Sequence, residues 1–334
     1  MLVFARPSAC LVCAAPLMPW LEDVEDRVYG VAGAWRYTRC VGPDCGTVHL
    51  DHDLTADQLA GFYAAYSTHS APVLTASGIK RLYRDALGSI QHELLGYATH
   101  PGNAARLAGK VLSAVPFFRQ NALARLFWLP AKPCGRVVEV GYGNGQGLAT
   151  LRAAGWEVIG CEFDAECINA AREKGFEVYS GGLDDARLPA ASVDAVVASH
   201  LVEHVPDPTA FVREAARILR PGGRLVLLTP NAAGHDAVRF GRDWRGLEPP
   251  RHLTVHTPSS LHRMATAAGF GEISVFGTAL GGFIMQQTRE LAAGEVPSPQ
   301  QGRKTVRYHF AAGLRNALDD LASDEIVMQC RLPS

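Results

Sequence analysis

The stretch RVVEVGYGNGQG, residues 136–147, decides the fold of this chain. A run rich in valine, typical of a buried strand, leads into a glycine at every second position, and the helical pattern LATLRAAG follows. Glycines let the backbone turn tightly and approach a ligand, and the start of a helix offers unpaired N–H groups. The dinucleotide fingerprint needs a glycine where Gln146 stands, so the sequence does not fit an NAD site.

Downstream of the glycine loop, short strand-like runs alternate with helical patterns. The runs read WEVIGCE, FEVYS, VDAVVAS and GRLVLLT. This alternation is typical of βαβ units, which form a parallel sheet covered by helices on both faces. We therefore expect an α/β fold with a doubly wound, Rossmann-like sheet. The run DEIVMQCRLP near the end of the chain is expected to add a last, antiparallel strand.

The order of these motifs resembles that of class I S-adenosylmethionine-dependent methyltransferases. The spacing Glu-x-Gly-x-Gly-x-Gly at 139–145 matches their first motif, and four further matches follow in order as far as Asn231. These matches begin at VIGCEFD, SGGLDD, VDAVVASHLVEH and AARILRPGG. The resemblance implies a seven-stranded methyltransferase sheet, with S-adenosylmethionine as the co-substrate that supplies the methyl group.

The resemblance also implies which residues surround this donor. The family holds the ribose hydroxyls with an acid at the end of the second strand, here Glu162, and flanks the adenine with the loop after the third strand. In that loop Gly182 stands where many relatives carry Asp, so backbone groups of Leu183 and Asp184 are expected to contact the adenine. The expected donor-binding residues are Glu139, Gly141, Tyr142, Gly143, Gly145, Glu162, Phe163, Gly182, Leu183, Asp184 and Ser199.

The pattern HLVEH at 200–204 has two interpretations. It matches an inverted zinc-peptidase motif, which needs His200 and His204 one turn apart on a continuing helix. Proline is not tolerated in a helix interior, however, and the residues PDP follow at 206–208. A helix is therefore expected to begin near Asp207, which places HLVEH in the loop after the preceding strand.

In the loop interpretation, these side chains face the transferred methyl group, because open parallel sheets bind ligands at the carboxyl ends of their strands. His204 or His200 would orient or deprotonate the acceptor, a role suited to a group that titrates near neutrality. Alternatively, His204 only caps the loop by hydrogen bonding. The loop also resembles Glu-x-x-Glu-His in ubiquinone-pathway O-methyltransferases, which can hold a divalent cation; His200 replaces the first Glu here.

The stretch DWRGLEPPRHL at 243–253 resembles a loop that lies over the active site in one branch of these enzymes. His252 in this loop is a third candidate catalytic residue, beside His200 and His204. Two roles are open for Arg251: it either faces the active site or pairs with a carboxylate that fixes the loop.

Half of the eight cysteines lie near the start of the chain, in two tight turns joined by a predicted hairpin. They are Cys10, Cys13, Cys40 and Cys45. Such an arrangement can supply the four thiolates of a structural zinc ion, and a reduced, metal-free hairpin is the alternative. The same methyltransferase branch often carries an N-terminal zinc ribbon ending in DCG, as here. The second pair is spaced more widely than usual, so His49 and His52 are reserve ligands.

Composition limits the classes of function. The 334 residues carry a formal net charge of −1, which argues against a nucleic-acid-binding surface. The apolar start of the chain lacks a basic leader, and a cytoplasmic protein is therefore expected. A transmembrane helix is not expected, because the sequence has no uncharged apolar run of about 18 residues. Residues 114–130 fit either an interfacial amphipathic helix or a helix packed on the main domain.

We expect three regions: a zinc-ribbon-like domain at 1–50, a helical lid or linker at 51–132, and the methyltransferase domain at 133–334. Within the last, residues 278–322 are expected to form an inserted hairpin arm and helices. The expected activity is methyl transfer to a small-molecule acceptor, with a hydroxyl of a sugar, lipid intermediate or secondary metabolite as the methylated group. The alternatives are a catalytically silent module that binds S-adenosylmethionine and holds a partner through the ribbon, and the HLVEH metallopeptidase.

Overall fold

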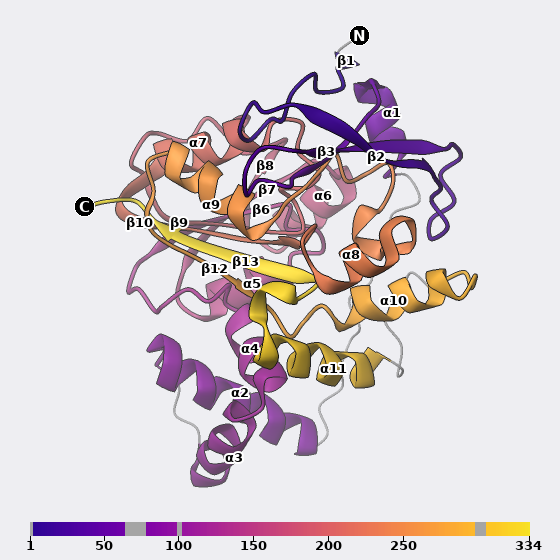
Figure 1. The fold of residues 1–334 in the computed structure, drawn as a ribbon. Helices are drawn as coiled ribbons and strands as arrows, with labels where there is room; N and C mark the ends of the chain where they lie inside the picture. The colour runs from indigo at the N-terminus through magenta and orange to yellow at the C-terminus, as the bar shows by residue number, and fades with distance from the viewer. Residues whose placement is uncertain (1–2, 64–77, 99–101, 298–304) are drawn as a thin grey trace.

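A seven-stranded sheet forms the centre of the computed structural model, which describes residues 3–63, 78–98, 102–297 and 305–334 (Figure 1). The strand order is β12-β13-β10-β9-β6-β7-β8. The parallel strands are β6 (Arg136–Val140), β7 (Glu157–Glu162), β8 (Glu177–Ser180), β9 (Val193–Ser199) and β10 (Leu219–Pro230). As predicted, β13 (Glu325–Arg331) is antiparallel; it runs between β10 and β12 (Gly271–Gly277).

The order of the strands reverses at β6, which pairs with β7 on one side and with β9 on the other. This is the topological switch point of a doubly wound sheet, where a ligand crevice opens beyond the carboxyl ends of the strands. The predicted α/β, Rossmann-like methyltransferase sheet is thereby confirmed.

Helices cover both faces of the sheet, as the valine-rich strands require. On β6, Val138 packs into one hydrophobic core and Val137 into the other. The first core includes α7 (Pro208–Ile218) and α9 (Pro258–Ala267), and the second includes α5 (Gln146–Ala153) and α6 (Ala165–Glu173). The switch point is therefore covered by packed helices on both faces of the sheet.

The segment before the sheet is helical. Its helices are α1 (Ala56–Gly61), α2 (Gly78–Leu95), α3 (Asn103–Ser113) and α4 (Pro116–Ala124). Helices α2 to α4 pack on one another at the end of the molecule farthest from α1 (Figure 1). Leu126 and Leu129, just after α4, are buried in the core that also contains α5, which favours the packed alternative for this stretch.

Helices also fill the region between β12 and β13. They are α10 (Gly282–Ala292), α11 (Thr305–Leu318) and the short η3 (Asp320–Ala322). The expected hairpin arm is not seen in the described part of 278–322, where the regular elements are all helical. None of the helices described in this chain combines the length and the apolarity that crossing a bilayer needs.

A second, four-stranded sheet contains the N-terminal ribbon. Its order is β11-β4-β3-β2, where β2 is Leu17–Val24, β3 is Trp35–Cys40, β4 is Val48–Leu50 and β11 is Thr254–Val255. A small additional pair joins β1 (Val3–Phe4) to β5 (Leu54–Thr55). Strand β11 comes from the segment after β10 and pairs with β4 of the ribbon. The ribbon sheet therefore includes a strand from beyond the predicted domain boundary at residue 50.

The four N-terminal cysteines lie together at one end of this sheet. The sulfur of Cys10 is 3.7 Å from that of Cys45, the sulfur of Cys13 is 3.4 Å from that of Cys40, and all four lie within 4.8 Å of one another. Tetrahedral zinc, with Zn–S bonds of about 2.3 Å, places its sulfur ligands about 3.8 Å apart. The cluster is therefore compatible with a zinc ribbon.

The wide second turn closes around Gly42. A Cβ atom there would lie 2.8 Å from the Cβ of Ala15, so a larger residue would push the turn away from the cysteines. The backbone N–H of Gly42 donates to the sulfur of Cys40 at 3.3 Å. The reserve ligands lie outside the set of four: His52 accepts the backbone N–H of Arg36, and His49 contacts the sulfur of Cys10 at 3.4 Å.

Zinc content tests the ribbon. Cys40→Ser should lower the zinc that co-purifies by about one ion per chain, because it removes one of four thiolates. Structural zinc supplies on the order of 10 kcal/mol of folding free energy, so residues 1–50 should become protease-sensitive while β6–β9 stay folded. Elemental analysis measures the zinc content, and limited proteolysis with mass spectrometry measures the protease sensitivity.

Cys134→Ser, at an exposed cysteine, is the control. An unchanged zinc content in Cys40→Ser would contradict the assignment.

Candidate active site

The glycine loop lies at the switch point, directly after β6. Gly141, Gly143 and Gly145 have φ values of 70°, 52° and 74°, a conformation that other residues rarely adopt. A Cβ at Gly141 would also lie 2.9 Å from the side chain of Leu201. Helix α5 begins at Gln146, so its N-terminal N–H groups lie beside the loop. The backbone itself thus forms this wall of the site.

Glu139 and Tyr142, the expected donor residues nearest the start of the glycine loop, have buried side chains. The carboxyl group of Glu139 lies against Gly147, and burial raises its pKa to about 8. This carboxyl group is therefore mostly protonated at neutral pH in the isolated protein, and a nearby cation would favour its ionised form. The ring of Tyr142 packs in the core against Gly160, so Tyr142 has only its backbone to offer a donor.

Glu162 ends β7 with its carboxylate fixed in place by backbone groups. One oxygen accepts the N–H of Gly143 at 2.9 Å, and the other accepts the N–H groups of Phe163 at 2.8 Å and Asp164 at 3.2 Å. A carboxylate has further lone pairs, which suit the two hydroxyls of a ribose. The side chain of Phe163 is 72% exposed, and its ring offers a flat apolar surface for an adenine.

The loop after β8 lies beside this ring. A Cβ at Gly182 would be 3.8 Å from the ring of Phe163. Leu183 is buried in the core, so it faces a donor with its backbone alone, while Asp184 is exposed. Asp185, which no sequence pattern singles out, stabilises this loop: its carboxylate accepts the N–H of Gly182 at 2.7 Å.

The HLVEH segment is a loop, as predicted. It follows Ser199, the last residue of β9, and α7 begins at Pro208 with Asp207 as its N-cap. The metallopeptidase interpretation is wrong, because these five residues form turns rather than a helix. The two histidines of the segment also have different partners.

His200 lies between two carboxylates. Its Nε2 is 3.1 Å from Glu325, and its Nδ1 is 3.5 Å from Glu203. Burial lowers the pKa of His200, but hydrogen bonds to the carboxylates of Glu203 and Glu325 outweigh this and raise it to about 10. At neutral pH the ring is therefore a cation, and it has no lone pair with which to accept a proton.

His204 has a different environment. Its Nδ1 is 3.1 Å from the carbonyl oxygen of Arg251 and 2.8 Å from the hydroxyl of Tyr63, which lies just beyond α1. A carbonyl oxygen can only accept, whereas the Tyr63 hydroxyl can accept as well as donate, so a proton on Nδ1 satisfies both contacts. We therefore assign this tautomer, which leaves a lone pair on Nε2. His252 lies 4.6 Å away, ring centre to ring centre, and its Nδ1 faces the carbonyl of Gly246 at 2.7 Å. Burial lowers the pKa of His252 to about 4, so this ring is neutral.

A second cluster of side chains in this chain could bind a metal ion. Glu203, His204 and His252 each bring one ligand atom within 4.8 Å of the others. One oxygen of Glu203 accepts the hydroxyl of Thr229 at 2.9 Å, and the other lies 3.5 Å from Nδ1 of His200 and 4.0 Å from Nε2 of His252. Two imidazoles held at Nδ1 by carbonyl oxygens, together with a carboxylate, suit a divalent transition metal. His252 was predicted from the sequence as a catalytic residue and not as a metal ligand, because it lies 48 residues from His204 in the chain.

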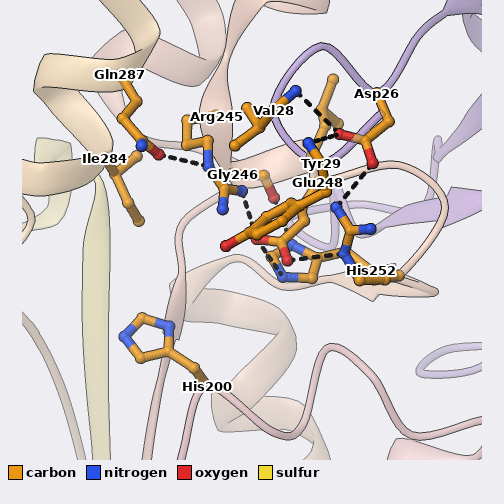
Figure 2. A network of polar contacts seen from close by, with 12 residues as sticks. Asp26, Val28, Tyr29, His200, Arg245, Gly246, Glu248, His252, Ile284 and Gln287 are labelled. Carbon is orange, nitrogen blue, oxygen red and sulfur yellow. Dashed lines mark hydrogen bonds and ion pairs between the residues drawn. The ribbon is translucent and has the colours of Figure 1, made fainter. Parts of the chain in front are cut away.

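Arg251 pairs with carboxylates, the second of its two expected roles. It is fully buried, with one nitrogen 3.0 Å from Asp26 and another 3.0 Å from Glu248. Arg245 binds the other oxygen of Glu248, so two cations and two anions balance in the interior (Figure 2). The sequence did not predict the roles of Asp26 and Glu248, because no local pattern distinguishes them from acidic residues on a protein surface.

Comparison with known proteins identifies the family. A sequence profile described as "Methyltransferase domain" matches residues 110–275. A Mycolicibacterium smegmatis protein named "Probable S-adenosylmethionine-dependent methyltransferase" is 32% identical over 180 residues, covering 49% of this chain and 67% of the relative. This chain belongs to the S-adenosylmethionine-dependent methyltransferase family.

Other similarities are more limited. The match to a Mycobacterium tuberculosis protein with the same name is 31% identical and covers 48% of this chain but only 58% of the relative. A ubiquinone biosynthesis O-methyltransferase of Xanthomonas oryzae is 37% identical over 29% of this chain and 43% of its own length. A methyltransferase structure from Archaeoglobus fulgidus aligns with a TM-score of 0.45 at 19% identity, over 68% of this chain and 98% of that one.

Donor binding tests this wall of the site. Glu162→Gln should weaken S-adenosylhomocysteine binding by about 10- to 100-fold, since a hydrogen bond to a charged group is worth about 1.5–3 kcal/mol. Gly143→Val should abolish binding, because it strains the backbone and fills the loop. Calorimetry measures both affinities. Glu173→Gln and Gly175→Ala are matched controls on α6 and just after it; Gly175 has φ 70° and open space around it. Unchanged affinity in both test variants would contradict the donor site.

Proposed function

We propose that this protein transfers the methyl group of S-adenosylmethionine to a hydroxyl group of a small-molecule acceptor, and that His204 accepts the hydroxyl proton. The observation that carries the proposal is the hydrogen bond between Nδ1 of His204 and the carbonyl of Arg251. It leaves a basic nitrogen on a loop at the carboxyl end of β9, the edge at which such sheets bind ligands.

In this proposal, one set of residues binds the donor and another set orients the acceptor. When bound, S-adenosylmethionine supplies a methyl carbon already activated by the positive sulfur, so the protein mainly has to align the acceptor and exclude water. Glu162, Phe163 and the glycine loop hold the donor. Glu139 can stabilise the donor's ammonium group, because a cation beside it favours the carboxylate.

Among the three candidate histidines, His204 suits the base best. His200 is kept protonated by Glu203 and Glu325, and we assign it a positioning role for the carboxylates. His252 is only 4% exposed, and it lies behind His204 as a neutral support. A hydroxyl acceptor also agrees with the name of the Xanthomonas relative, an O-methyltransferase.

Methyl transfer tests the role of His204. Isotope-labelled S-adenosylmethionine, incubated with the protein and the small-molecule fraction of a cell extract, should label one acceptor. His204→Ala should reduce this labelling by about 10²- to 10⁴-fold, the usual contribution of a positioned base, without loss of S-adenosylhomocysteine affinity. His262→Gln, at an exposed histidine on α9, is the control. Near-normal labelling in His204→Ala would mean that this residue only caps the loop.

A catalytically silent module predicts a different result in the same assay. In that case wild-type protein binds S-adenosylhomocysteine but labels nothing in any extract fraction. The two proposals are therefore separated by the wild-type protein before any variant is made.

A divalent metal ion at Glu203, His204 and His252 is a second candidate, favoured by the convergence of one ligand atom from each residue and by the neutral ring of His252. Such an ion would bind the acceptor oxygen and lower the pKa of its hydroxyl, and His204 would then be a ligand instead of a base.

Metal titration separates these two roles. With the ribbon already loaded, calorimetric addition of Zn²⁺ or Mn²⁺ should detect one further site if the ion is real. His252→Ala should weaken this site by at least about tenfold, and His262→Gln should leave it unchanged. If wild-type protein takes up no further ion, the metal candidate is rejected and His204 remains the base.

A further inference from the structure

The hairpin between β2 and β3 of the ribbon ends in a loop folded around Asp26. One oxygen of Asp26 accepts the N–H groups of Val28 at 3.1 Å and Tyr29 at 2.9 Å, and the other accepts the N–H of Val31 at 3.2 Å. The same second oxygen binds the guanidinium of Arg251 at 3.0 Å (Figure 2). Asp26 therefore orders the ribbon loop and holds a residue of the methyltransferase domain at the same time.

The ribbon loop also covers the guanidinium of Arg251. The ring of Tyr29 lies over it, 4.3 Å from the guanidinium carbon to the ring centre, and Glu248 binds it from a third direction at 3.0 Å. A planar cation held by an aromatic face and two carboxylates has little freedom to rotate. The backbone of Arg251 is consequently fixed relative to the ribbon.

That backbone leads directly to the proposed base. The carbonyl oxygen of Arg251 faces Nδ1 of His204 at 3.1 Å, and the N–H of Leu253 donates to the carbonyl of Glu203 at 2.8 Å. Beyond Leu253, the chain enters the ribbon sheet as β11, and Thr257 donates to the carbonyl of Cys45 at 2.6 Å. The ribbon thus holds the segment from Arg251 to Thr257 at both of its ends.

We propose that Asp26 is a positioning residue for the active site. Through Arg251 it places the carbonyl that, beside the hydroxyl of Tyr63, accepts a hydrogen bond from the proton on Nδ1 of His204 and so leaves the lone pair on Nε2. The zinc ribbon then serves to shape the acceptor side of the active site. The inference rests on the proposed function only in the role given to His204, because the tautomer of this ring can be measured without an acceptor.

Asp26→Asn is the decisive variant. It preserves size and one oxygen, but it replaces the oxygen that accepts from Arg251 either with an NH₂ group that repels the guanidinium or with a neutral oxygen. Glu25→Gln, at the exposed neighbouring residue, is the matched control. Nitrogen NMR of ring-labelled histidine should show His204 as the Nδ1–H form in wild type and Glu25→Gln, and as a mixture in Asp26→Asn. Hydrogen exchange should rise in residues 245–257 of Asp26→Asn alone.

The affinity for the donor analogue distinguishes a local change in the acceptor loop from misfolding of the whole protein. S-adenosylhomocysteine should bind Asp26→Asn within about twofold of wild type, because the donor wall is built from β6, β7 and β8. Tyr29→Leu, which removes the ring that contacts both Arg251 and Arg245 but leaves Asp26 in place, should shift the tautomer less and in the same direction. The proposal would be overturned if Asp26→Asn showed the same His204 tautomer and the same hydrogen exchange as wild type. It would also be overturned if Asp26→Asn lost donor affinity well beyond twofold, because the substitution would then disturb the whole domain and not the acceptor loop alone. Failure of His204 as the base would instead appear as normal methyl transfer in His204→Ala.

Discussion

The ion cluster around Arg251 is the interaction on which the arrangement of this molecule depends. A guanidinium that is fully buried loses its hydration, and only close carboxylates compensate for that loss. One of them, Glu248, lies on the same loop, but the other, Asp26, belongs to the ribbon. Removing one partner of a buried pair typically costs about 3–5 kcal/mol, a large share of the 5–15 kcal/mol that stabilises most domains. Docking of the ribbon is therefore a condition for a stable acceptor loop.

This constraint explains how the two walls of the site differ. The proposed donor wall lies on strand ends and a glycine loop, where backbone N–H groups hold the carboxylate of Glu162 in place. The proposed acceptor wall consists of loops, and the ribbon contacts these loops through Arg251 and β11. A common donor site can in this way be combined with an acceptor site whose shape is set by an added domain.

The sequence predicted those features that depend on local chemistry. Positive φ values require glycine at 141, 143 and 145, and the prolines at 206 and 208 confine HLVEH to a loop, so both were read correctly. Long-range contacts left no such local signal. The pairing of His200 with Glu325 joins the loop to the last strand of the sheet, and Asp26 meets Arg251 across most of the chain. Helical periodicity likewise predicted helices before the sheet, but not that Tyr63 would reach His204.

A crystal structure of the protein with S-adenosylhomocysteine would show whether donor and proposed base face each other. We expect the adenine against Phe163, the ribose hydroxyls on Glu162, and the sulfur facing Nε2 of His204. A complex in which the sulfur points away from His204, or in which the donor lies outside the glycine loop, would contradict this arrangement.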